Sequence, residues 1–171
     1  VSGIMVYAKN PKAAASLSTS LQQGKIEKWY QAVICGKPVD NNGTYVDYLK
    51  QDKKNNCSRI VDKSDPESKR AELEYKVLDC IQTEEKDPQY LSLVEIKLLT
   101  GRHHQIRVQF SGHGTPLYGD GKYGNNEKAV RKSLALCACH LRFKHPATGR
   151  IMDFQIKPDT GAFKLFSKNI S

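Results

Sequence analysis

The stretch of residues 90–110 constrains the fold of this chain more than any other. Apolar and polar residues alternate through its first half, which predicts a half-buried β-strand. Thr100-Gly101 then breaks the alternation, and a glycine after an apolar run marks a turn. Ile106 and Phe110 follow four positions apart, so they lie on one side of a short helix. The sequence therefore predicts a strand, a turn and a helix that carries Arg107 on a different side from its apolar residues.

The rest of the chain predicts further strands and few helices. Asn10-Pro11 predicts a helix start, since asparagine caps helix N-termini and proline fits the first helical position, and Gly24 fits the helix end. Residues 37–56 are rich in turn formers and are interpreted as an irregular excursion with one short strand at Val46–Leu49. The other predicted elements are strands at Gly3–Ala8, Lys28–Gly36, Ser58–Asp62, Ala71–Val77, Tyr90–Leu99, Leu134–Lys144 and Ile151–Ile156, and a helical turn at Glu127–Ser133.

These elements fit in one domain. A chain of 171 residues is the size of a single domain and can bury a core without disulfides or metals. Gly3–Ala8 is a short apolar run and is expected to be a buried strand. Alternating strands with two or three helices predict an α+β fold on a mixed, mainly antiparallel sheet.

The charge of the chain favours a polyanionic partner. The net charge is +9 and the pI is about 9.3. Between residues 101 and 150, nine basic residues face two acidic ones, so nine minus two places +7 in that span. RNA or DNA is a better match for such a surface than a membrane. The alternatives are a basic surface that serves solubility and a basic scaffold that docks an acidic protein.

Several classes of protein do not fit the sequence. The five cysteines are odd in number and form no CxxC pair, which predicts a reducing, cytoplasmic environment with buried thiols. The spacing of Cys137, Cys139 and His140 matches no common zinc site. No apolar run approaches the roughly 20 residues of a membrane span. A monomer is the default expectation.

Arg107 and the glycines after it are the residues that could bind a ligand or take part in a reaction. A guanidinium can pair with a carboxylate in a cleft or bind phosphate through two parallel hydrogen bonds. The alternative is a salt bridge that only fastens the helix to the sheet. Gly119, Gly121 and Gly124 allow a ligand to approach the backbone closely, or belong to an ordinary long loop.

Longer motifs then resemble a known family. Residues 100–108 (TGRHHQIRV), 112–120 (GHGTPLYGD) and 123–124 (YG) resemble the third motif region of RluA-type pseudouridine synthases, GR-x-HQ-[IL]-R, then GHP-[IL]-x-GD and YG. Thr115 expands the usual GHP by one residue. Residues 28–36 resemble the K-x-Y-x-A…G motif of the family. Residues 71–75, with Leu73 in place of threonine, and 134–149 resemble its later strands in the same order.

This resemblance implies an enzyme that isomerises specific uridines in RNA, either rRNA or tRNA, to pseudouridine by base flipping, without cofactor or metal. The nucleophilic aspartate of the family lies in H-R-L-D-x-x-[TV]-S-G, and Val1-Ser2-Gly3 matches the end of that motif. The aspartate is therefore expected three positions before Val1. Residues 1–171 are expected to be an N-terminally incomplete catalytic domain that is inactive alone.

The same resemblance assigns roles to individual residues. Tyr30 is expected to be the active-site tyrosine that stacks on the flipped base and could remove a ribose proton. Arg107 is expected to pair with the upstream aspartate. The residues expected to support the site or bind substrate are Lys28, Arg102, His104, Gln105 and Ile106, of which Ile106 is expected to pack beneath the site. The alternative is a catalytically inactive relative that only binds RNA.

Overall fold

A computed structural model describes residues 1–83, 89–124 and 133–166. The described residues contain two α-helices, a 3-10 helix and an eight-stranded sheet. The helices are α1 (Pro11–Gln22), α2 (Gln105–Gly112) and the 3-10 helix η2 (Gly161–Phe166). The strands are β1 (Ser2–Gly3), β2 (Glu27–Cys35), β3 (Asn42–Asp52), β4 (Cys57–Val61), β5 (Lys69–Gln82), β6 (Tyr90–Leu98), β7 (Leu136–Lys144) and β8 (Ile151–Gln155).

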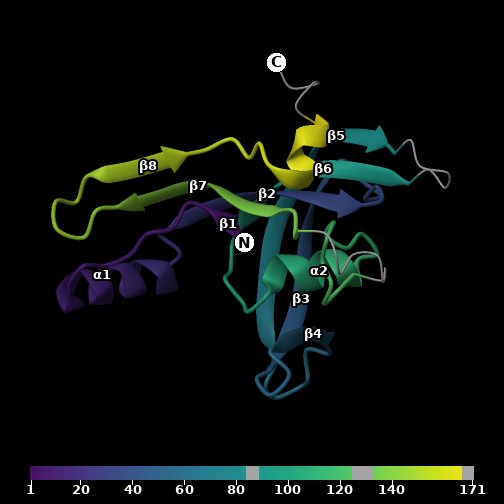
Figure 1. Ribbon diagram of the computed structural model, residues 1–171. Helices are drawn as coiled ribbons and strands as arrows, with labels where there is room; N and C mark the ends of the chain where they lie inside the picture. Colours follow the sequence, from purple (N-terminus) through teal and green to yellow (C-terminus); the bar gives the residue numbers. More distant parts are fainter. Residues whose placement is uncertain (84–88, 125–132, 167–171) are drawn as a thin grey trace.

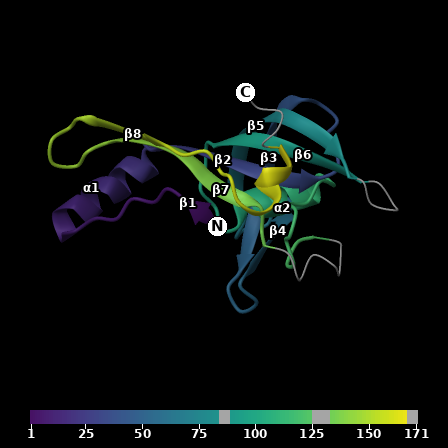
Figure 2. The same ribbon diagram turned by 45° about the horizontal axis from the view of Figure 1, so that its top comes forward.

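The sheet confirms the predicted fold class. Its order is β1-β7-β2-β6-β5-β3-β4, and β8 pairs with β7. β1 runs parallel to β7, and the other described pairs are antiparallel. The fold is thus α+β, with a mixed, mainly antiparallel sheet. Figures 1 and 2 show α1 and the β7–β8 hairpin extending from one end of the molecule, while α2 lies beside β3 and β4.

Strand β2 separates two apolar cores. Its residues Ala32 and Ile34 are fully buried on the face that α2 covers, where Ile106 and Phe110 pack against them. Val33 points to the opposite face because successive side chains of a strand alternate. There it packs with the two phenylalanines of η2. The predicted helix therefore lies directly over the strand that carries Tyr30.

Helix α1 begins and ends where the sequence predicts. The Asn10 side chain accepts a hydrogen bond from the backbone N–H of Ala13 at 2.8 Å, so it caps the helix. Gly24 follows the helix with a φ of +67°, the left-handed conformation that glycine tolerates best. Leu17 packs against a small cluster that includes Leu141 of β7, which attaches α1 to the hairpin.

The predicted buried strand at Gly3–Ala8 is wrong, because strand β1 ends at Gly3 and residues 3 and 5–8 are exposed. Met5 and Tyr7 are 69% and 78% exposed. The reason lies at the edge of β7. β1 uses only the first part of that edge, and β8 occupies it from the pairing of His140 with Gln155 onward. No further backbone groups of β7 are available to residues 5–8 on this side.

Strand β3 is longer than predicted. Instead of a short strand at Val46–Leu49 within an irregular segment, residues 42–52 form one continuous strand. β5 pairs with one edge and β4 with the other, so the backbone is extended although its side chains are mostly polar.

In the predicted helical turn at Glu127–Ser133, residues 127–132 lie outside the described residues.

Two further observations concern environment. Within the described residues, no helix combines the length and apolar character needed to cross a membrane. Cys137 and Cys139 are buried, and the other three cysteines are half-buried. Burial raises the pKa of the Cys139 thiol to about 11, so this thiol keeps its proton at neutral pH.

Candidate active site

The turn between β6 and α2 is fixed by one buried glutamine. Gln105 is 3% exposed. Its Oε1 accepts hydrogen bonds from the Thr100 hydroxyl at 2.8 Å and from the Arg102 backbone N–H at 2.9 Å. Its Nε2 donates to the Glu72 carbonyl of β5 at 3.0 Å. Both ends of the amide are therefore bound by the protein, and Gln105 fixes the start of α2.

His104 makes the sharp change of direction that starts α2. It has a φ of 52° and a ψ of 24°, in the left-handed region. The Tyr123 hydroxyl lies 2.8 Å from Nδ1 of His104 and also accepts the Ser58 backbone N–H at 2.9 Å. Which of the two groups donates depends on which imidazole nitrogen carries the proton, since the hydroxyl has one donor and two acceptor positions. Burial, and next the charge of Arg107, lower the pKa of His104 to about 4, so it is neutral at pH 7.

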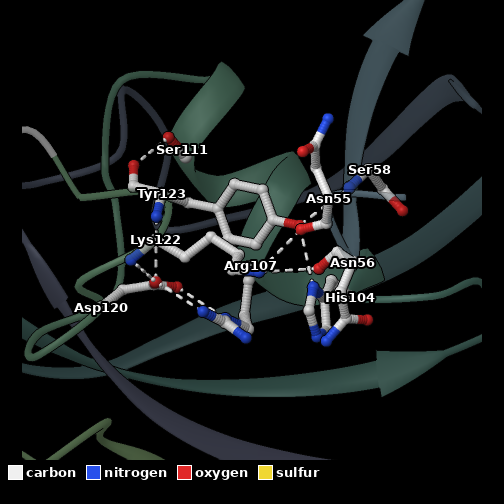
Figure 3. Close-up of polar contacts among 9 residues, drawn as sticks. All are labelled: Asn55, Asn56, Ser58, His104, Arg107, Ser111, Asp120, Lys122 and Tyr123. Carbon is white, nitrogen blue, oxygen red and sulfur yellow. Dashed lines mark hydrogen bonds and ion pairs between the residues drawn. The ribbon is translucent and has the colours of Figure 1, made fainter. Parts of the chain in front are cut away.

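The β3–β4 hairpin is anchored to the same turn. His103 lies 2.9 Å from the Ser58 hydroxyl through Nδ1 and 3.1 Å from Oδ1 of Asn56 through Nε2. The Lys122 ammonium donates to the carbonyls of Asn55 and Asn56 at 3.3 and 2.8 Å. As Figure 3 shows, the hairpin tip therefore lies against the loop that follows α2.

Arg107 forms a two-point ion pair with Asp120. Nε donates to Oδ2 at 2.8 Å and Nη2 donates to Oδ1 at 2.7 Å. The Asp120 side chain is fully buried, whereas 16% of the Arg107 side chain is exposed. The guanidinium lies over the face of the Tyr123 ring, with 4.9 Å from the ring centroid to Cζ (Figure 3). The sequence analysis included Asp120 only as the aspartate of the GD motif, so this partner was not predicted.

The charge of Asp120 is stabilised by its contacts. Burial raises the pKa of the carboxyl, but the hydrogen bonds from Arg107 and from the backbone N–H groups of Tyr123 and Lys122 outweigh burial. The pKa therefore lies below its ordinary value. Both backbone N–H groups bind Oδ1 at 3.0 Å. The pair is thus ionised on both sides at neutral pH.

A pocket of about 290 Å³ brings most of the predicted site residues together. Six of the seven line it: Tyr30, Arg102, His104, Gln105, Ile106 and Arg107. Val1 and Ser2 line the same pocket. The seventh, Lys28, lies beside Tyr30 in a neighbouring pocket, and burial lowers the pKa of its ammonium. Burial also raises the pKa of Tyr30, so its phenol keeps its proton at neutral pH.

The side chains of the pocket differ in what they have available for a ligand. Arg102 is an exposed residue, and its Nε donates to the Arg70 carbonyl at 2.9 Å. Ile106 is 4% exposed and belongs to the apolar core that lies under α2, while it also lines the pocket. Two of the five N–H groups of Arg107 donate to Asp120. Among the described residues, no cluster of three or more His, Cys, Asp or Glu side chains is placed to hold a metal ion.

Two residues of this network were missed by sequence reasoning. Asp120 and Tyr123 were noted only as parts of the GD and YG motifs. Their partners, Arg107 and His104, lie 13 and 19 positions earlier in the chain. The three glycines around them indicated a shaped loop, but local spacing does not show which side chain such a loop faces.

Comparison with known proteins identifies the family. A family model described as RNA pseudouridylate synthase matches residues 1–112. The chain belongs to the RNA pseudouridylate synthase family, and its resemblance to the RluA type is confirmed.

Individual relatives agree with this assignment. An uncharacterized RNA pseudouridine synthase of Bacillus subtilis, YlyB, is 36% identical over 154 residues, which are 90% of this chain and 48% of that protein. Ribosomal large subunit pseudouridine synthase D of Zymomonas mobilis is 34% identical over 161 residues, with 90% and 48% covered. The solved structure of human RNA pseudouridylate synthase domain containing 1 superposes with a TM-score of 0.73 at 25% identity, covering 89% of this chain and 62% of that one. The chain spans about half the length of the curated relatives it matches.

Proposed function

We propose that residues 1–171 form most of the catalytic domain of an RNA pseudouridine synthase whose nucleophilic aspartate lies three positions before Val1. One observation carries the proposal: Val1 and Ser2 line the same pocket as Tyr30 and Arg107. A residue shortly before Val1 is therefore within reach of both side chains, since each residue of extended chain spans at most about 3.6 Å. The domain is incomplete in this proposal, and the segment alone is inactive.

The proposed reaction is an isomerisation. The bond from ribose C1′ to N1 of uracil breaks, the base turns over, and C1′ bonds to C5. C5 loses its proton and N1 gains one, so the reaction balances without a cofactor. The base must leave its stack to reach the pocket, which requires base flipping.

Arg107 supports the nucleophile in this proposal. A nearby cation keeps a partly buried carboxylate ionised, and an ionised carboxylate is the stronger nucleophile. The two-point bond to Asp120 leaves three N–H groups of the guanidinium for this second carboxylate. Arg107 can therefore bind the upstream aspartate while it keeps its ion pair with Asp120.

Tyr30 stacks on the flipped base, and Ile106 forms the apolar floor below it. The raised pKa of Tyr30 favours a neutral phenol in the resting site. Proton removal by Tyr30 then requires a partner that lowers this pKa when RNA binds. Arg102, which is exposed at the pocket, and Lys28, in the neighbouring pocket, bind RNA phosphates through charge in this proposal.

The proposed substrate is structured RNA in the cytoplasm, bound by a monomer. The net charge of +9 supports RNA binding that weakens steeply with salt. Both rRNA and tRNA fit this surface. The relatives named as ribosomal large subunit synthases C and D favour rRNA.

The test uses protein that extends about 40 residues upstream of Val1, beyond the aspartate expected there. It is incubated with rRNA and tRNA transcripts made with uridine tritiated at C5, because bond formation at C5 releases the label. We expect release by the extended protein and none by residues 1–171 alone. RNA binding without release by the extended protein would instead identify an inactive relative. Binding to acidic protein but not to RNA would identify a scaffold.

A further inference from the structure

We propose that Asp120 is a positioning residue for the isomerisation: it holds one edge of Arg107 so that the opposite edge faces the pocket. The inference rests on the proposed function, since it concerns the same site. It adds a residue whose carboxylate is fully buried and does not line the pocket itself.

The two-point bond determines where the free edge points. A guanidinium is planar, and a carboxylate that binds two of its nitrogens removes rotation about the side-chain axis. Nε and Nη2 are bound by Asp120, so Nη1 and the second N–H of Nη2 lie on the other edge. Arg107 lines the pocket and is partly exposed, whereas Asp120 is not. The free edge is therefore the part of Arg107 that a second carboxylate can meet.

Asp120 is itself held rigidly. Its Oδ1 accepts two backbone N–H groups, from Lys122 and Tyr123, and its backbone carbonyl accepts the N–H of Gly124 at 2.9 Å. Gly119, directly before it, has a φ of +75°, and a Cβ there would collide with the Ser133 carbonyl. The loop is thus shaped around the position of one carboxylate.

Tyr123 and His104 complete the support without adding charge. The Tyr123 ring packs against one face of the guanidinium, and its hydroxyl is held by His104 and Ser58. Lys122 points its ammonium away, to the carbonyls of the hairpin. Among these neighbours Asp120 carries the one negative charge that Arg107 meets.

Helix α2 has polar contacts to the rest of the domain besides the Asp120 pair. Gln109, on another side of the helix, donates to Asp47 of β3 at 2.8 Å, and the Ser111 hydroxyl donates to the Tyr123 carbonyl at 2.6 Å. Neither Asp47 nor Gln109 lines the pocket. Asp47 is therefore a matched control: a carboxylate that binds α2 but does not contact Arg107.

The test compares Asp120→Asn and Asp47→Asn in the extended protein by steady-state tritium release. Asparagine keeps the size of the side chain, but its amide N–H would face an N–H of Arg107, so one of the two hydrogen bonds is lost. We expect Asp120→Asn to lower kcat by about 10- to 100-fold, the range for losing a hydrogen bond to a charged group. KM is expected to stay within about twofold, since the RNA contacts remain. Asp47→Asn is expected to keep kcat, whatever its thermal stability.

A double-mutant cycle separates positioning from a structural role. If Asp120 acts through Arg107, Asp120→Asn has little further effect on kcat in an Arg107→Lys background. Equal losses in both backgrounds would overturn the inference, as would unchanged kcat in Asp120→Asn. If Asp120→Asn does not fold, Asp120→Glu keeps the charge but moves the carboxylate, and we expect at least a tenfold loss in kcat, roughly the penalty of an ångström-scale displacement; unchanged kcat again overturns the inference. Wild-type protein without turnover would overturn the proposed function, and this role with it.

Discussion

Removal of the cation from the buried ion pair tests how the site is held together. In Arg107→Met, the Asp120 carboxylate remains fully buried and keeps only the two N–H groups of Lys122 and Tyr123. Leaving one charge of a buried pair without its partner costs about 3–5 kcal/mol. Each kcal/mol lowers Tm by about 2–4 °C in a domain of this size. We therefore expect Tm to fall by roughly 6–20 °C at pH 7.

The loss should depend on pH. In the wild-type chain the Asp120 pKa is lowered, so its stabilisation is complete above the unfolded-state pKa of about 3.9 and disappears as the pH falls through the lower folded-state value. Without Arg107, burial dominates and the folded-state pKa rises above the unfolded one. Destabilisation of the variant then increases as the pH rises through that window. The difference in unfolding free energy should be larger at pH 7 than at pH 4.

Urea unfolding of both proteins at pH 4, 5.5 and 7 measures this difference. Lys50→Met is the control, because it removes the cation from a solvent-accessible pair with Asp65 and Glu67 and should change stability far less. Adding Asp120→Asn to Arg107→Met removes the unpaired charge and should restore part of the stability at pH 7. A change below about 1 kcal/mol in Arg107→Met, or a loss independent of pH, would refute the reasoning.

Three further expectations follow from single residues. Arg107→Lys in the extended protein should reduce turnover far more than RNA affinity, because one ammonium cannot hold two carboxylates in fork geometry; equal losses in tritium release and in a gel shift would indicate a phosphate-binding role instead. The His104 pKa of about 4 lies below its ordinary 6.5, so the unfolded state takes up a proton first and stability should fall as the pH drops from 6.5 to 4. Asparagine tolerates the left-handed backbone, so His104→Asn should reduce this pH dependence of the unfolding free energy in urea. An unchanged pH dependence would show that another group causes it. Gln105→Ala should cost about 2–4 kcal/mol in urea unfolding, since its three hydrogen bonds join the turn to Glu72; a loss below about 1 kcal/mol would show that water replaces them.

Local sequence patterns predicted the elements that depend on local physics. The alternation before Thr100, the glycine after it and the i, i+4 pair Ile106 and Phe110 were sufficient to predict the strand, turn and helix of the site. Asn10 likewise predicted the start of α1, since a cap bonds within its own turn. In each case the deciding contacts join residues close in the chain.

The contacts that were not predicted join distant residues. The length of β1 depends on how much of the β7 edge β8 occupies, and that competition has no local signature. The polar strand β3 is extended because β4 and β5 pair with both its edges. The Asp120 pair depends on a loop folding back over α2. Tyr30 and Arg107 were named from motif resemblance, and the pocket that they share with Val1 was visible only in three dimensions.

The central claim is that an aspartate upstream of Val1 meets the free edge of Arg107 in the pocket of Tyr30. The most direct test is a crystal structure of the extended protein. The quantity to measure is the distance from that carboxylate to Nη1 and Nη2 of Arg107. We predict a separation within about 4 Å, the range of a salt bridge, with the Asp120 pair still in place. A carboxylate on the far side of the sheet, or no carboxyl group in the 40 or so residues before Val1, would contradict the account.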